Sequence, residues 1–187
     1  MHMRSMFGHI AQIARDQRGV SAIEFALVAP LMVGLYLGCV EIADGVSVDR
    51  KVTMTAAALA NLSAQVTTIS ATDMTNMFDA STAIIAPYDA TKLKVTLTCL
   101  KIDSTGKANV AWSATRNGTA YTAGSTYTFG SNNAALAVPN SWLLLGEASY
   151  AYTPTIGYTI TGTLTLSDKM FMSPRISPPS YGTASCS

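Results

Sequence analysis

The feature that most constrains this chain is an unbroken apolar run from Val20 to Val40. Glu24 is the only charged residue within it. A helix rises about 1.5 Å per residue, so the run spans roughly 31 Å, about the thickness of a bilayer's hydrocarbon core. A carboxylate inside a spanning segment is costly and therefore points to a function. The sequence thus predicts a membrane-spanning helix with a functional acid near its start.

The residues around Glu24 indicate a cleavage signal. Arg15, Arg18 and Gly19 precede the run, and Phe25 follows the acid. This arrangement resembles the cleavage region of type IV pilin-like precursors, in which a membrane peptidase cuts after the Gly. Glycine allows a peptidase to approach the backbone closely. The resemblance predicts a 1–19 prepilin leader, cleavage after Gly19 and a new N-terminus at Val20.

A physical argument supports the spacing between Val20 and Glu24. Pilin-like helices assemble into a shared apolar core, where a free α-amine and a carboxylate both lose water. Each charge is costly alone and less costly when paired. Glu24 is therefore predicted to neutralise the amine of a neighbouring subunit, with Phe25 and Pro30 in the same assembly segment. The alternative is a Glu side chain that only extends to the lipid headgroups.

Three other interpretations of the apolar run remain open. A secretory signal peptide would have a shorter apolar stretch and an Ala-x-Ala cleavage site, which does not occur before Glu41. Leu37-Gly38-Cys39 suggests a lipoprotein signal, but Tyr36 stands where such signals usually carry Leu. The main alternative is an uncleaved anchor that crosses the membrane once.

Charge sets the expected orientation and excludes one class of partner. Arg4, Arg15 and Arg18 against Asp16 make the N-terminal flank positive, which predicts that it is cytoplasmic. The remainder would then lie in the periplasm, or outside the cell in an assembled pilus. From Asp44 onward the sequence has nine Lys and Arg residues and eight Asp and Glu residues. This near-neutral balance indicates no nucleic-acid surface.

The helix is expected to continue beyond the membrane. Apolar residues recur at spacings of four and three as far as Val66, which predicts one helix from Val20 to about Thr68. A second, shorter helix is predicted from Asp73 to Tyr88, ended by Pro87. The predicted divisions are a transmembrane or assembly helix over 20–43, and a helix extension with an α+β extracytoplasmic domain over 44–187.

Beyond residue 90 the pattern changes to the alternation of β-strands. Residues 92–115 predict a hairpin whose second strand carries Val110, Trp112 and Ala114 on one face. Residues 118–140 are expected to be mostly loop. Two more strands are predicted over 143–153 and 158–172, followed by an extended tail. Helices followed by an antiparallel sheet indicate an α+β fold.

Two cysteines lie in the predicted exported part. A disulfide between Cys99 and Cys186 would join the tail to a strand in an oxidising compartment. The alternative is two free thiols with Cys99 buried, and geometry decides between them. Cys39 lies in the apolar run and is expected to pack as a small apolar residue.

Further residues extend the resemblance over nearly the whole chain. They are Ala22-Ile23-Glu24-Phe25-Ala26-Leu27, Pro30, Glu41, Arg50-Lys51-Val52, Leu62, Ala86-Pro87-Tyr88, Val110-Ala111-Trp112-Ser113, Asn117-Gly118, Glu147, Tyr150, Tyr152, Pro154 and Pro174-Arg175. Together they resemble the TadE-like minor pilins, or pseudopilins, of the tight-adherence (Flp/Tad) pilus, in the form found in alphaproteobacteria. Phe25 replaces the Tyr of major Flp pilins, which fits a minor subunit.

The resemblance implies a structural role in starting, capping or completing a pilus. Implied partners are the prepilin peptidase, sibling minor pilins, the major Flp pilin, the inner-membrane assembly platform and membrane lipid. No cofactor is implied. An enzyme is not expected, because no His follows His9 and the acids are not clustered.

The alternative function is an uncleaved periplasmic adhesin or carbohydrate-binding domain. Aromatic side chains on the predicted strands and the loop before them would form its sugar-binding surface, although aromatics on strands more often pack in a core. These residues are Tyr121, Tyr127, Trp142, Tyr150 and Tyr152.

Overall fold

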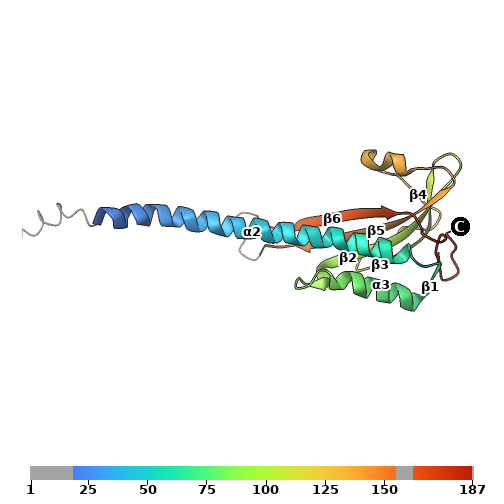
Figure 1. Cartoon of the computed structure of the whole chain (residues 1–187), viewed down its shortest axis with the longest axis horizontal. Helices are drawn as coiled ribbons and strands as arrows, with labels where there is room; N and C mark the ends of the chain where they lie inside the picture. Colours follow the sequence, from blue (N-terminus) through green and yellow to red (C-terminus); the bar gives the residue numbers. More distant parts are fainter. Residues whose placement is uncertain (1–18, 155–161, 187) are drawn as a thin grey trace, which may run out of the picture.

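The computed structural model describes residues 19–154 and 162–186. It confirms the predicted α+β fold: a long N-terminal helix, a short second helix and then an antiparallel sheet (Figure 1). The elements in chain order are α2 (Val20–Ser63), β1 (Thr68–Ile69), α3 (Ala71–Ala83), η2 (Ala90–Lys92), β2 (Leu93–Ile102), β3 (Ala108–Arg116), β4 (Thr126–Tyr127), η3 (Ser131–Leu136), β5 (Ser141–Tyr152), β6 (Leu164–Met172) and β7 (Ser180–Tyr181).

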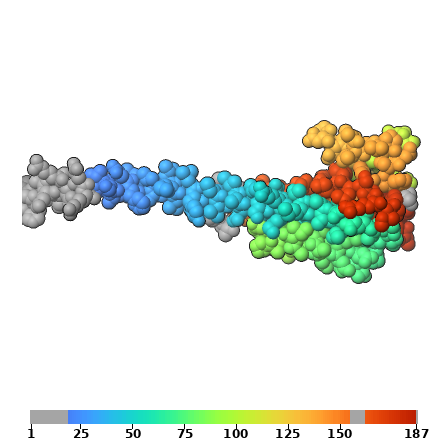
Figure 2. All heavy atoms as spheres, viewed as in Figure 1, coloured from blue at the N-terminus to red at the C-terminus, as the bar shows by residue number. Residues whose placement is uncertain are grey.

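Helix α2 gives the molecule its elongated shape. It has 44 residues, which at about 1.5 Å per residue is roughly 66 Å. Its N-terminal half stands clear of the other described elements, whereas its C-terminal half lies along the sheet (Figure 1). The space-filling view shows the same division into a thin rod and a compact head (Figure 2).

The main sheet has five strands in the order β4-β3-β2-β5-β6. Helices α2 and α3 pack on one face, over a cluster that includes Val52, Leu59, Phe78, Leu97 and Leu144. A second cluster, built on Leu100, Val110 and Leu145, lies on the other face. There, aromatic side chains from residues 118–140 cover one end of the sheet, including Tyr127 and Phe129. The sheet therefore has apolar material on both faces.

One predicted alternation in β3 is wrong. Val110 and Trp112 were expected on one face, but Val110 belongs to the second cluster and Trp112 to the helix-facing cluster. The register explains the change, because Cys99 pairs with Trp112 while Leu100 pairs with Val110. Ala111 is thus an extra residue, and a β-bulge of this kind reverses the side-chain alternation.

Helix α2 passes close to the sheet at Gly146 in β5. A Cβ at Gly146 would overlap the Ala56 carbonyl oxygen and lie 3.0 Å from the Ala60 backbone nitrogen. Small residues on both elements therefore allow the helix backbone to approach the strand. The sequence analysis did not predict this contact, although an isolated glycine inside a strand pattern can indicate a close backbone approach.

Both predicted helices are too long at their C-terminal ends. Helix α2 ends at Ser63 rather than near Thr68, because Thr68 and Ile69 form β1, which pairs in parallel with β7. Helix α3 ends at Ala83, and the residues up to Tyr88 form turns. At its start, Ser70 caps the helix and Asp73 completes a capping box, so the predicted start at Asp73 is also late.

Shorter differences follow in the second half of the chain. The predicted loop over 118–140 contains β4 and the 3-10 helix η3. Strand β6 begins at Leu164, and the predicted strand residues 158–161 lie outside the described residues. The tail contributes β7 rather than only an extended segment.

Candidate functional site

The candidate site is the exposed, apolar N-terminal half of α2, defined here as residues 20–40. Its large side chains point into open space on all sides, with Phe25 71% exposed and Leu27 75% exposed. By length and composition the helix can cross a membrane, with a mean hydropathy of 2.0 over its most apolar window, none of which is buried. A helix that is apolar all round is expected in lipid or in a protein bundle.

The predicted processing residues lie at the tip of this half. Gly19 precedes the helix as its N-cap without a side-chain hydrogen bond, and Val20 is the first helical residue. Among described atoms, none lies within 4 Å of the place where a Gly19 Cβ would be. The backbone at the predicted cleavage point is therefore open on this side.

The predicted assembly residues are also on the outside of the rod. Glu24 and Phe25 are exposed, and Pro30 lies inside the continuous helix. The structure places Val20 and Glu24 one helical turn apart on the same rod, and it shows no second copy. Their roles in assembly therefore stay predictions.

The change from the free half to the packed half occurs over Glu41 to Val48. Glu41 is 2% exposed and Val48 is fully buried. Gly45 sits beside the ring of Tyr152 at the end of β5, where a Cβ would lie 3.7 Å from Cε1. The head therefore begins to cover α2 between Glu41 and Val48.

Polar contacts fix the packed half to the head. Lys51 Nζ donates hydrogen bonds to the carbonyl oxygens of Ile84 at 3.1 Å and Ala86 at 2.6 Å, just after α3. On the β6 side, the Thr53 hydroxyl donates to Asp168 at 2.6 Å. Sequence analysis assigned Lys51 no structural role, because its partners are backbone carbonyls more than thirty residues away.

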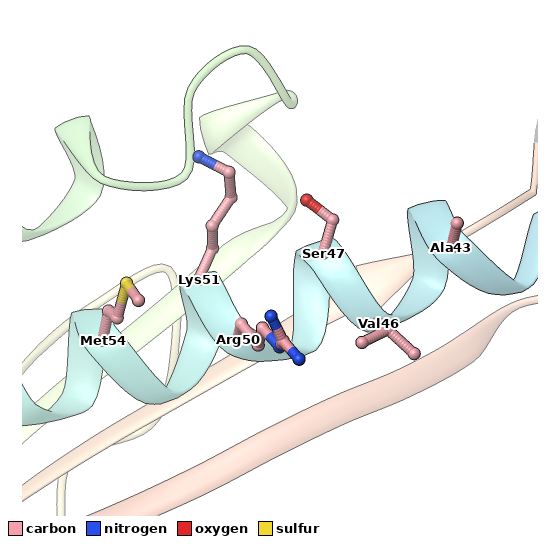
Figure 3. A pocket seen from close by; sticks show the side chains of 6 residues that line it. All are labelled: Ala43, Val46, Ser47, Arg50, Lys51 and Met54. Atoms are coloured by element: carbon pink, nitrogen blue, oxygen red, sulfur yellow. The ribbon is translucent and has the colours of Figure 1, made fainter.

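A shallow groove of about 520 Å³ runs along α2 beside the Lys51 contact. It is lined by Ala43, Val46, Ser47, Arg50, Lys51 and Met54. Figure 3 shows the Lys51 side chain reaching toward the chain after α3, whereas Arg50 projects from a different side of the helix. The groove therefore joins the free half of α2 to the surface of the head.

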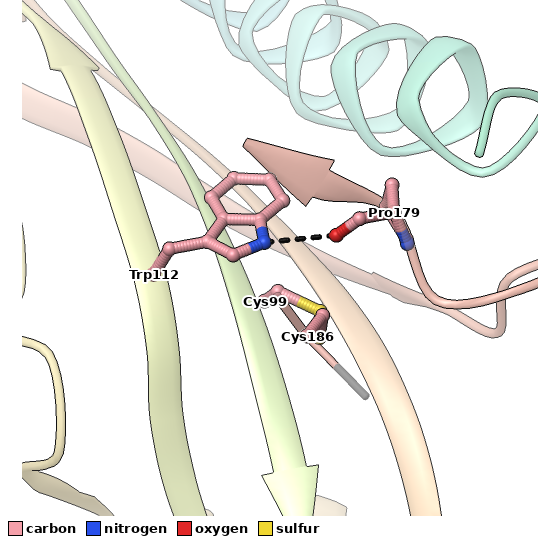
Figure 4. Close-up of a disulfide and its surroundings, with 4 residues drawn as sticks. All are labelled: Cys99, Trp112, Pro179 and Cys186. Carbon is pink, nitrogen blue, oxygen red and sulfur yellow. Dashed lines mark hydrogen bonds between the residues drawn. A yellow bond between two sulfur atoms is a disulfide. The ribbon is translucent and has the colours of Figure 1, made fainter. Parts of the chain in front are cut away.

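The C-terminal tail contacts the C-terminal end of α2. The Arg175 amide donates to the Ala64 carbonyl at 2.9 Å, and its guanidinium donates to the Asn61 side chain at 2.7 Å. Cys99 and Cys186 form a disulfide with a Cα–Cα distance of 6.1 Å. Beside it, Trp112 Nε1 donates to the Pro179 carbonyl at 2.9 Å (Figure 4). The tail thus connects the end of the rod to the central strand β2.

The aromatic residues proposed for sugar binding do not form one surface. Tyr150 and Tyr152 are buried on the helix-facing side of β5, and Trp142 packs against the same cluster. Tyr121 and Tyr127 lie on the opposite face. Trp142, Tyr150 and Tyr152 are an even number of residues apart on β5 and so face one side, whereas Tyr121 and Tyr127 come from the segment that covers the other side.

The second face also carries a polar cleft of about 200 Å³. In it, Lys169 Nζ lies 2.7 Å from Glu147, which also accepts a 3.1 Å hydrogen bond from the Tyr121 hydroxyl. Burial raises the pKa of Tyr121, and the Glu147 charge adds to the shift. Burial acts to lower the pKa of Lys169, but hydrogen bonding and charge attraction from Glu147 raise it overall. The opposite charges of Glu147 and Lys169 neutralise each other.

The described residues contain no group of three or more His, Cys, Asp or Glu side chains that could hold a metal ion. A model of one protein family, described as TadE-like protein, matches residues 19–60. Residues 19–60 are therefore similar to TadE-like proteins. The match covers the free half of α2 and most of its packed half, and it confirms the predicted family resemblance over this segment.

Neither the curated proteins nor the solved structures gave a match to this chain. The match suggests a protein associated with the Tad pilus. Its long apolar helix fits a membrane anchor in a pilus-associated protein.

Proposed function

We propose that this protein is a minor pilin, or pseudopilin, of a Tad (Flp) pilus, acting in its assembly, initiation or capping without enzymatic activity. The observation that carries the proposal is the continuous helix α2. One half is apolar on all sides and free, and the other is packed into a folded head. The TadE-like match over residues 19–60 covers the same helix.

In this proposal a prepilin peptidase cuts after Gly19 and frees the α-amine of Val20. Before assembly, residues 20–43 anchor the protein in the inner membrane, with the N-terminal side cytoplasmic and the head periplasmic. During assembly the free half leaves lipid and packs against the helices of the major pilin and the other minor pilins. The assembly platform in the inner membrane carries out this transfer.

Glu24 then pairs with the Val20 amine of a neighbouring subunit. Its carboxylate has no described partner within the chain that would compete for this role. Leaving one of two buried charges unpaired costs about 3–5 kcal/mol. The pair would therefore favour one axial register over others.

The experiment compares Glu24→Ala with the neighbouring control Ser21→Ala in a strain that assembles the pilus. Intact-mass analysis of the membrane protein should show Val20 at the N-terminus in both variants. Incorporation into sheared filaments should fall more than tenfold for Glu24→Ala and stay normal for Ser21→Ala. Normal piliation by a chain that retains residues 1–19 would instead support the uncleaved periplasmic adhesin or carbohydrate-binding anchor.

A further inference from the structure

The face of the sheet opposite the helices changes from apolar to polar along its strands. One part carries Leu145 and lies under aromatic side chains such as Tyr127. The next two rows across β2, β5 and β6 are polar, and they line the cleft of about 200 Å³: Thr96, Glu147 and Lys169, then Lys94, Ser149 and Ser167. A polar sheet face is ordinary where it meets water. This part of the face, however, has two features that solvation alone does not require.

The first feature is a wall built by the chain after β3. The Asn117 side chain donates a hydrogen bond to the Leu93 carbonyl oxygen at 3.0 Å, which ties the loop to the start of β2. Gly118 then lies against the sheet, since a Cβ there would be 2.8 Å from Thr115 Oγ1 and 3.7 Å from Lys94 Cβ. A glycine permits this close approach. The cleft is therefore bounded by the loop on one side and by β6 on the other.

The second feature is a largely buried carboxylate with one unused oxygen. The Glu147 side chain is only 16% exposed. Its Oε1 accepts the hydrogen bond from the Tyr121 hydroxyl and also contacts Lys169 Nζ. Within residues 19–154 and 162–186 the other oxygen, Oε2, has no hydrogen-bond partner, although it is not closed off from solvent. Oε2 can therefore accept hydrogen bonds from the hydroxyl groups of a ligand.

Groups with free hydrogen-bonding capacity surround that oxygen. Lys94 is exposed, and its ammonium group makes no hydrogen bond or ion pair with any described residue. The hydroxyls of Ser149 and Ser167 also lack partners in the described part of the chain. Lys94 lies directly opposite Ser149 and diagonal to Glu147 on the same face, where such diagonal neighbours are about 7–8 Å apart. One small ligand can therefore reach the cation, the carboxylate and the hydroxyls together.

These groups select a ligand by its charge and its donors. An inorganic anion would meet Lys94 but would face the Glu147 carboxylate, and an amine would be repelled by both lysines. Asp168 also borders the cleft, but its carboxylate accepts the hydrogen bond from Thr53 on the helix-facing side. A neutral sugar would leave Lys94 unpaired. A molecule with several hydroxyl donors and one negative group satisfies all of these groups.

We propose that this cleft binds an acidic sugar, a uronic acid unit of a saccharide. Its carboxylate pairs with Lys94, and its ring hydroxyls bond to Glu147 Oε2, Ser149 and Ser167. The site goes beyond the pilin function, because it lies on the head and uses no residue of the free half of α2. It also differs from the aromatic surface considered from the sequence, since none of those aromatic residues lines the cleft.

The test is titration calorimetry of the full chain in detergent. Sodium glucuronate is the ligand, and glucose and acetate each present one half of its chemistry. Glucuronate should bind with a dissociation constant on the order of 1 mM, and glucose and acetate at least about tenfold more weakly. Acetate binding equal to glucuronate binding would show attraction of anions only and would overturn the proposal. The absence of saturable glucuronate binding would overturn it as well.

Variants assign the roles within the cleft. Lys94→Gln should lower the affinity for glucuronate about tenfold, to the level of glucose. The matched control is Lys101→Gln, an exposed lysine on the same strand outside the cleft, which should leave binding unchanged. Equal losses in these two variants, or no loss in Lys94→Gln, would contradict the assignment of the ligand's carboxylate to Lys94.

The carboxylate is tested by the preference between two ligands. Glu147→Gln should reduce the preference for glucuronate over acetate at least about fivefold, because it removes the acceptor for the sugar hydroxyls. Circular dichroism checks that this variant folds, since it also loses the contact with Lys169. Ser149→Ala keeps that contact and should weaken glucuronate binding about threefold. An unchanged preference in Glu147→Gln together with unchanged binding in Ser149→Ala would refute the sugar site.

Discussion

The two halves of α2 belong to one helix but bury their side chains in different ways. In residues 20–40 apolar side chains surround the helix and remain exposed, whereas in residues 48–63 one side of the helix is buried under the head. The first pattern matches a surrounding that is apolar on every side, and the second matches a single sheet face. One continuous helix can thus lie partly in an apolar surrounding and partly against a folded domain. Its side-chain pattern shows where the one environment gives way to the other.

The largest expected effect comes from truncating the same residue type in each half. Leu59→Ala removes a fully buried side chain beneath the sheet and should lower the free energy of unfolding by about 2–5 kcal/mol. Leu31→Ala, in the free half, should leave head stability unchanged. Urea unfolding of the full chain in detergent, followed by tryptophan fluorescence, measures both. A similar loss for Leu31→Ala would show that the free half packs on the head.

The cysteines offer a second matched pair. Cys186→Ser breaks the bridge that holds the tail to β2 across 87 residues, and should destabilise the head by about 2–4 kcal/mol. Cys39→Ser changes the free, exposed thiol in the other half and should have no effect on unfolding. Thermal unfolding with and without reductant tests this. If reductant leaves the midpoint of the wild-type protein unchanged, the bridge does not contribute to stability.

Substitutions at two glycines distinguish the effect of close packing from the effect of helix propensity. Gly146→Ala places a methyl group against the backbone of Ala56 and Ala60, and should lower the free energy of unfolding by about 1–3 kcal/mol. Gly45→Ala adds a methyl group at ordinary contact distance inside a helix, and should stabilise by about 0.5–1 kcal/mol. Chemical denaturation of both variants compares them, and equal effects would contradict the close crossing at Gly146.

Two adjacent cations distinguish a structural contact from an exposed charge. Lys51→Met loses hydrogen bonds to two carbonyl oxygens after α3 and should destabilise the head by about 1 kcal/mol. Arg50→Met removes no hydrogen bond within the described residues, so its free energy of unfolding should stay within about 0.5 kcal/mol of the wild-type value. The midpoint of urea unfolding reports the difference. A larger loss of stability for Arg50→Met than for Lys51→Met would contradict the assignment of the anchoring contact to Lys51.

The smallest effect concerns how the helices begin. Helix α2 has no side-chain cap, whereas Ser70 and Asp73 cap α3. Hydrogen bonds from the Ser70 side chain and backbone lower the pKa of Asp73 below its usual 3.8. The stabilisation is therefore complete above that value and disappears as the pH falls through the lowered pKa. The protection of α3 amides against hydrogen exchange, taken relative to the intrinsic exchange rate at each pH, should fall as the pH drops through the lowered pKa, and Asp73→Asn should remove this dependence.

Local patterns predicted the elements better than their ends. The alternation of Leu93, Val95, Leu97 and Cys99 predicted β2 because one face of that strand is buried under the helices. The end of α2 was placed too late because Thr68 and Ile69 pair with β7, more than one hundred residues away. The bulge at Ala111 also depends on a cross-strand register, which alternation within one strand does not contain.

The sequence by itself determined that this chain has a membrane-length helix, an acid near its start, an extended rod and a later β-region. These properties follow from composition and period, which act over neighbouring residues. Only the tertiary structure decided that Gly146 allows the close approach of the helix and that Lys51 holds the chain after α3. Those properties depend on which distant segments meet, and burial and hydrogen bonding between them are decided by packing rather than by local preference.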